Sequence, residues 1–147
     1  MQMISPKEVI NELLVDVFNH ILSIENDVLK KRGVKLSMTE VHVLEAIRSV
    51  NPSTMGNVAQ KLRITMGTLT TSINVLARKK YVIRTRDEKD KRRVNLTLTD
   101  AAVEVLSIHD SFHNEMIDSI FADLELDKDK VLLKSLDNIR KYFKRLY

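Results

Sequence analysis

The sequence contains no cysteine among its 147 residues, and only three glycines and two prolines. Without cysteine the chain forms no disulfide and offers no thiolate as a nucleophile or metal ligand, which is compatible with a reducing compartment. Glycine and proline supply the turns of sandwiches and barrels, so their scarcity favours a mostly helical protein. A length of 147 residues with 44% hydrophobic residues suits one folded domain.

Long apolar runs are missing as well. No window reaches the roughly 18 uncharged apolar residues of a membrane span. The segment "MQMISPKEVINELL" carries acids where a secretory signal needs an unbroken apolar stretch. The sequence also lacks a phosphate-binding glycine loop, a nucleophile elbow, HExxH and CxxC. We therefore expect a cytoplasmic protein without membrane contact that is not an enzyme.

Charge is unevenly distributed along the chain. Residues 36–99 hold 12 Lys or Arg against 5 acids, a net charge of +7, whereas the remaining residues hold 12 against 15, a net charge of −3. A basic centre between slightly acidic flanks is typical of a nucleic-acid-binding core on a scaffold that avoids phosphates. An ordinary solvated surface on a basic protein explains the charge alone equally well.

Helical apolar spacing surrounds this basic centre. It predicts a long helix over 6–31 and further helices over about 100–124 and 128–146, the last capped by Asp127. The region 36–99 is complete without them, so their apolar stripes need another cover, and a second copy of the chain supplies one. We predict a single domain with a winged helix-turn-helix core at 36–99 and dimerisation helices at 1–35 and 100–147.

Within the core, the sequence predicts two short helices across a tight turn. A helix comes before them: Ser37 and Glu40 form its capping box, and "NPST" ends it. The first short helix is "TMGNVAQKL". The turn "RI" joins it to the second short helix, which Thr65 caps. In the last helix, a spacing of 100° per residue predicts a buried stripe of Leu69, Ile73 and Leu76.

The opposite side of this helix is small and polar. It carries Thr65, Gly67, Thr68, Thr70, Thr71, Asn74, Val75 and Arg78. A solvated face would use Lys and Glu, because Thr and Gly weaken a helix by several tenths to about 1 kcal/mol each. In a major groove, a Thr methyl suits thymine, Asn suits adenine and Arg suits guanine. The pattern therefore favours a DNA recognition helix.

Two alternating segments follow, "YVIRTRD" and "RVNLTLT", joined by "DEKDKR". They predict an antiparallel hairpin whose strands anchor it to the core, with Thr99 capping the next helix. The hairpin carries six cations for phosphate or minor-groove contacts: Arg84, Arg86, Lys89, Lys91, Arg92 and Arg93.

This order of elements resembles the MarR family of winged-helix transcription regulators, whose wing motif is matched by Asp90, Arg92, Leu98 and Thr99. The resemblance implies a sequence-specific repressor that binds double-stranded DNA at a pseudo-palindromic operator as a homodimer joined by its terminal helices. It also implies that Arg92 enters the minor groove while Asp90 orients its guanidinium. Relatives usually carry Gly where this chain has Lys80.

The segments "ITMGTLTTSINVLARKKYVIRTR" and "IHDSFH" are similar to the repressors of fatty-acid synthesis in Gram-positive bacteria. This likeness implies long-chain acyl-acyl-carrier-protein as corepressor, with its acyl chain among apolar residues between the helices. The pocket candidates are Phe18, Leu22, His42, His109, Phe112 and His113.

The histidines also allow a zinc site. His109 and His113 are four residues apart on one helix face, and with His42 and Glu25 they offer a tetrahedral ligand set. Zinc-responsive repressors of the same family resemble the chain at these positions, although those sensors carry a Cys in a second site. The alternative is a pair of histidines at the core edge, hydrogen-bonded to carboxylates or backbone.

A third function stays open from another class of protein. The winged helix could dock on a protein, as an interaction module. Weak salt dependence of any DNA binding would favour this interpretation, since phosphate contacts make affinity fall steeply with salt.

Overall fold

The computed structural model describes residues 4–146. The chain divides into two compact units, Met1–His109 and Asp110–Tyr147. The first unit therefore takes in the N-terminal helix as well as the predicted core at 36–99. The mostly helical fold with one hairpin agrees with the prediction. In order, the elements are α1 (Pro6–Glu12), η1 (Leu13–Val17), α2 (Phe18–Lys31), α3 (Met38–Ser49), α4 (Met55–Leu62), α5 (Met66–Arg78), β1 (Val82–Arg86), β2 (Val94–Leu98), α6 (Asp100–Leu124), η2 (Leu126–Lys128) and α7 (Lys130–Arg145).

The predicted helix over 6–31 is one helical run with a π-helical segment, η1, inside it. Ser5 begins it with a capping box, accepting from the backbone N–H of Glu8 while the Glu8 carboxylate accepts from the N–H of Ser5. After the run ends, Gly33 has a φ of 89°, the left-handed conformation in which glycine lacks the Cβ penalty.

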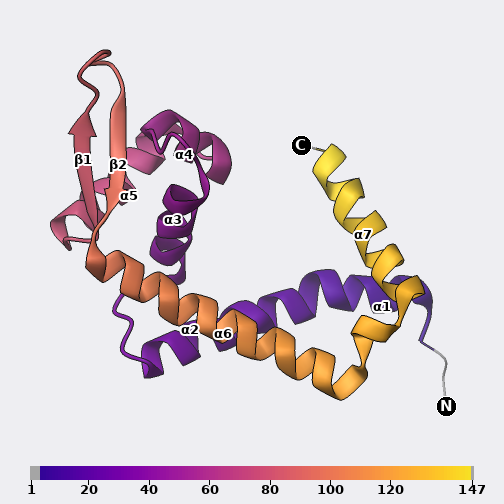
Figure 1. Cartoon of the computed structure of the whole chain (residues 1–147). Helices are drawn as coiled ribbons and strands as arrows, with labels where there is room; N and C mark the ends of the chain where they lie inside the picture. The colour runs from indigo at the N-terminus through magenta and orange to yellow at the C-terminus, as the bar shows by residue number, and fades with distance from the viewer. Residues whose placement is uncertain (1–3, 147) are drawn as a thin grey trace. The chain divides into compact units, whose positions relative to one another are not determined.

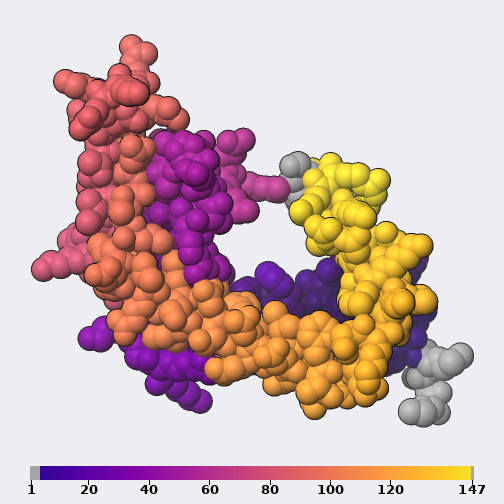
Figure 2. Space-filling model, in the orientation of Figure 1, coloured from indigo at the N-terminus to yellow at the C-terminus, as the bar shows by residue number. Residues whose placement is uncertain are grey.

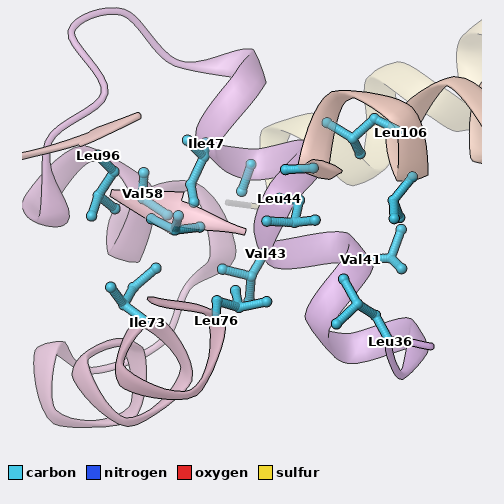
Figure 3. Packing of buried hydrophobic residues seen from close by; sticks show 14 of the residues in the cluster. Leu36, Val41, Val43, Leu44, Ile47, Val58, Ile73, Leu76, Leu96 and Leu106 are labelled. Carbon is cyan, nitrogen blue, oxygen red and sulfur yellow. The ribbon is translucent and has the colours of Figure 1, made fainter. Parts of the chain in front are cut away.

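Helices α2 to α6 and the hairpin all contribute side chains to the core, which Figure 3 shows from close by. Leu44, Val58, Leu69, Ile73 and Leu76 are completely buried. The predicted stripe of α5 is therefore the inner face of this helix. Each of these side chains contributes roughly 1.5–3 kcal/mol by leaving water, so this packing fixes which side of α5 remains outside.

The two strands pair antiparallel, with Val82 opposite Leu98 and Arg84 opposite Leu96. Val82 and Leu96 are buried and hold the base of the hairpin on the core. The backbone N–H of Leu96 also donates to Ser53 O at 2.8 Å. The hairpin thus stands on the helix-turn-helix beside α4 and α5, as Figure 1 shows.

Lys80 adopts a φ of 67°, so this chain tolerates a lysine in the left-handed conformation that favours glycine. Thr99 lies beside this turn. Its hydroxyl donates to Lys80 O at 2.8 Å, and its oxygen accepts from the N–H of Ala102 at 3.4 Å, as the predicted cap of α6. One side chain therefore ties the end of α5 to the start of α6.

In the second unit, the sequence located α7 correctly but named the wrong cap. Asp129, and not Asp127, accepts from the backbone N–H of Leu132 at 2.9 Å. Asp127 lies inside the short 3₁₀ helix η2, which is formed by the residues that were expected to begin α7. Among the described residues, no helix is long and apolar enough to cross a membrane.

Candidate DNA interface

Helices α4 and α5 and the hairpin form the candidate interface. Thr65 begins α5 as its N-cap, accepting from the backbone N–H of Thr68 at 3.2 Å, and its hydroxyl lies 2.9 Å from the Thr68 hydroxyl. The predicted outward face of the helix is exposed, except that Val75 is half-buried. The exposed members are Thr65, Gly67, Thr68, Thr70, Thr71, Asn74 and Arg78.

Two threonines on this face turn their hydroxyls back to their own helix. Thr70 Oγ1 donates to Met66 O at 2.7 Å, and Thr71 Oγ1 donates to Gly67 O at 3.2 Å. The single O–H donor of each threonine is thus used within the helix, but each hydroxyl oxygen can still accept a hydrogen bond. The methyl group of each threonine stays available for contact. The face therefore offers methyl groups and acceptors, together with the amide of Asn74.

Gly67 has no packing reason to be glycine. Within the part of the chain that the structure describes, a Cβ built there would meet only Thr65 Oγ1, at 4.0 Å, and the backbone is ordinary helix. Glycine inside a helix costs about 1 kcal/mol relative to alanine. Since no neighbour within residues 4–146 requires glycine at this position, the helix surface is suited to close approach by a partner outside the chain.

The hairpin extends beyond the helices, and its tip stands clear at the upper left of Figure 2. Asp87 Oδ1 organises the tip by accepting from the backbone N–H groups of Lys89 at 2.8 Å and Asp90 at 3.2 Å. These hydrogen bonds lower the pKa of Asp87 below its ordinary value. The carboxylate thus stays ionised while the tip presents its cations outward: Lys89, Lys91, Arg92 and Arg93 are exposed.

Asp90 has a different contact from the one the family resemblance implied. Its Oδ1 accepts from the backbone N–H of Arg92 at 3.0 Å. The carboxylate thus fixes the turn that carries Arg92, whereas orientation of the guanidinium by Asp90 stays a prediction. A short acidic side chain two residues before its partner reaches the backbone more readily than the end of a long side chain.

A cleft of about 530 Å³ lies between the helices and the hairpin. Its lining includes Arg84, Arg92 and Arg93 from the hairpin and Met66 and Thr70 from α5. The first turn of α4 also contributes, through residues that the sequence analysis missed: Met55, Gly56 and Asn57. Gly56 is a second helical glycine, and among the described residues a Cβ on it would meet no neighbour within 4 Å; this glycine is the signal that could have revealed them.

A cationic cleft beside a small, polar helix can hold a phosphate backbone while the helix meets base edges. The family model of the MarR family matches residues 33–93. FabT of Streptococcus pneumoniae, solved in complex with DNA, is 33% identical, with a TM-score of 0.84 over 96% of this chain and 99% of that chain. The chain belongs to the MarR family. It is a DNA-binding transcriptional regulator with the winged helix-turn-helix that the sequence predicted.

Other relatives agree. SarZ of Staphylococcus epidermidis, an HTH-type transcriptional regulator, is 28% identical over 76% of this chain and 73% of its own length. MepR of S. aureus, solved with DNA, is 18% identical with a TM-score of 0.73 over 95% of this chain and 99% of that chain, and shows the fold alone. The relatives are transcriptional regulators and not enzymes, as expected.

The histidine region of this MarR-family chain lies apart from the cationic cleft. His109 is buried, and its Nε2 forms an ion pair with the buried Glu25 carboxylate. Its Nδ1 lies 3.3 Å from Glu45 Oε1. Its ring packs edge-on against the His42 ring, with 6.2 Å between the two ring centroids. Three of the four predicted metal ligands therefore lie together in the first unit, with Glu45 beside them.

Glu45 was missed by the sequence analysis, although it follows His42 by three residues on the same helix. His113, the fourth predicted ligand, belongs to the second unit. There its ring packs edge-on against the ring of the buried Phe112, with 5.4 Å between the two ring centroids. Of the remaining pocket candidates, Leu22 is half-buried and Phe18 is 56% exposed. A cleft of about 460 Å³ beside His42 is lined by Glu45, Ala46, Arg48, Ser49, Lys61 and Leu62. The acyl pocket stays a prediction.

Proposed function

We propose that this MarR-family chain represses fatty-acid synthesis genes as a homodimer on a pseudo-palindromic operator, with long-chain acyl-acyl-carrier-protein as corepressor. The observation that carries the proposal is the likeness to FabT, a repressor of fatty-acid biosynthesis, at 33% identity over almost the whole of both chains. The residues that such a repressor needs toward DNA are exposed on α5 and on the hairpin.

In this proposal α5 enters the major groove, and the hairpin holds the flanking backbone and minor groove. Two copies related by a two-fold axis place two α5 helices about one DNA turn apart, which matches a pseudo-palindrome. The corepressor strengthens binding only if it has greater affinity for the arrangement in which both helices reach their half-sites. Its acyl chain contacts the pocket candidates, whereas the cationic cleft stays free for phosphate.

The test uses the full chain and an operator selected from a pool of random duplexes. Acyl-acyl-carrier-protein with a long chain is expected to increase operator affinity, whereas carrier protein without the acyl group leaves it unchanged. Equal affinity with both carriers contradicts the corepressor role while leaving DNA binding intact. A third outcome is that the chain selects no particular duplex from the pool and that its weak affinity for DNA barely changes with salt concentration. In that case the winged helix is instead a protein-interaction module.

A second candidate is zinc control of the same DNA binding. It rests on His42, Glu45 and His109, whose ligand atoms lie within 4.8 Å of one another, beside the buried carboxylate of Glu25. Imidazole nitrogens and carboxylate oxygens are zinc ligands. Zinc there would supply a positive charge beside the buried Glu25 carboxylate, and it would join α2, α3 and α6 within the first unit.

Metal analysis of the purified chain, followed by operator binding with zinc or chelator, tests this candidate. We expect bound zinc that His109→Gln removes and that His20→Gln retains, because His20 is exposed and outside the cluster. Operator affinity that is the same with zinc and with chelator contradicts zinc control.

A further inference from the structure

Asn74 of the recognition helix is bound by an arginine of the hairpin. Arg84 Nη1 donates to Asn74 Oδ1 at 2.6 Å. The two side chains come from different elements, α5 and β1, and both are exposed on the surface that meets DNA. The contact therefore joins the helix that reads the major groove to the hairpin that flanks it.

The chemistry of the two groups fixes how the amide lies. A guanidinium carries only donors, so the Asn74 atom that faces Arg84 is the carbonyl oxygen and not the amide nitrogen. The Asn74 nitrogen, with its two N–H donors, then occupies the other end of the amide. Asparagine recognises adenine by using both ends at once, with the oxygen on N6–H and the nitrogen on N7.

Arg84 is placed to hold this contact. Side chains alternate across a strand, so Arg84 shares the inner face of the hairpin with the buried Val82, and it pairs with the buried Leu96. It also lines the cationic cleft together with Thr70, one turn before Asn74 on α5. Its side chain thus extends from β1 toward α5, within the cleft that Arg92 and Arg93 also line.

We propose that Arg84 is a specificity-determining residue that acts by positioning Asn74. With its oxygen turned toward Arg84, Asn74 presents its two N–H donors to the groove and selects guanine, whose N7 and O6 both accept, over adenine, whose N6 donates. This replaces the Asn74–adenine pairing expected from the sequence. The inference rests on the proposed function, since it needs α5 to read base edges.

The experiment selects operators from a pool of random duplexes, using the full chain, Arg84→Met and Arg86→Met. Methionine keeps an apolar stem but has no N–H donor. In Arg84→Met the freed amide is expected to shift the preference from guanine toward adenine by about tenfold at one position of each half-site, the discrimination typical of one bidentate contact. Arg86→Met, two residues along the same strand face, is expected to weaken all sequences alike.

A second variant tests the amide donors of Asn74 directly. Asn74→Asp keeps an acceptor for Arg84 but removes both amide donors, so it is expected to lose the guanine preference without gaining adenine. Circular dichroism melting verifies that each variant folds. Unchanged base preferences in Arg84→Met, with uniformly weaker binding, would make Arg84 a phosphate contact and overturn the inference. Failure of the unmodified chain to select any sequence overturns the proposed function as well.

Discussion

Helices α5 and α7 each leave one face uncovered in the single chain, and the two faces have opposite chemistry. On α5 the uncovered side carries Gly67, the threonines and Asn74. On α7 it carries large apolar side chains, among them Val131, which is 78% exposed, and Leu136, which is 47% exposed. Neither face resembles a surface made for water, where Lys and Glu dissolve well and favour helix.

The difference indicates two kinds of partner. Small polar groups permit close approach and hydrogen bonding, which a hydrated groove with polar base edges requires. Exposed leucine, valine and phenylalanine side chains contribute stability only when another apolar surface covers them and removes them from water. MarR-family regulators are typically dimers, and the α7 face is suited to contact with a second copy.

The inner face of α5 is expected to control stability. Leu69→Ala removes a completely buried side chain and leaves a cavity, so we expect the free energy of unfolding to fall by about 2–5 kcal/mol. Urea denaturation measures the loss. Thr71→Ala, on the outer face of the same helix, serves as the control and is expected to change stability by less than about 0.5 kcal/mol. Equal losses in the two variants would refute the assignment of faces.

The uncovered face of α7 is expected to control association. Leu136→Glu places a charge among apolar side chains, and loss of that leucine from an interface weakens the dimer by about 2 kcal/mol or more, at least tenfold in dissociation constant. Sedimentation at several concentrations measures the change. Lys134→Glu adds the same side chain on the other side of the helix, about 200° away, and is expected to leave the dimer intact. Disruption by both variants would point to charge rather than to the apolar face.

Gly67→Ala is expected to act in opposite directions on folding and on DNA binding. Alanine raises helix stability by about 0.5–1 kcal/mol, since the added methyl meets nothing closer than 4.0 Å. The same methyl stands on the face that approaches DNA, so operator affinity is expected to fall. Thermal unfolding and gel shift measure the two effects. Asn138→Ala on α7 is the control, with a stability gain alone; unchanged affinity in Gly67→Ala would show that the glycine does not serve close approach.

Much of this surface could be predicted because it depends on local patterns. The spacing of Leu69, Ile73 and Leu76 identified the inner side of α5, and the capping residues Ser37 and Thr65 marked where helices begin. These signals lie within a few residues of each other, and the structure confirms them. The hairpin was equally readable, because its two strands alternate and a charged loop separates them.

Contacts between distant segments could not be predicted in the same way. The hydrogen bond from Arg84 to Asn74 joins two elements through side chains that each seemed available to DNA. Glu45 enters the histidine cluster only because α3 and α6 pack in the first unit. The cap of α7 was misplaced for a local reason, since Asp127 and Asp129 are both good N-caps and only the 3₁₀ turn decides between them.

Substitution of Glu40 is expected to change the free energy of unfolding only slightly, by an amount that depends on pH. Its carboxylate accepts from Lys79 Nζ at 2.7 Å and from the backbone N–H of Ser37 at 2.8 Å, so it links the start of α3 to the end of α5. Burial raises the pKa of Glu40, but the hydrogen bonds from Lys79 and Ser37 outweigh it and lower the pKa below the ordinary 4.5. A lowered folded-state pKa means that the ionised carboxylate stabilises the fold above pH 4.5 and that this contribution disappears as the pH falls below it.

Glu40→Gln keeps an acceptor but removes the charge. We expect it to cost about 0.5 kcal/mol at pH 7, as a partly exposed ion pair does, and the difference from the unmodified chain to disappear in acid. Urea denaturation from pH 7 to pH 3 measures both. Glu104→Gln, at an exposed carboxylate on α6, is the control and is expected to leave the stability at pH 7 almost unchanged. A difference for Glu40→Gln that persists unchanged in acid would mean that side-chain shape, and not the charge that joins α3 to the recognition helix, accounts for the loss.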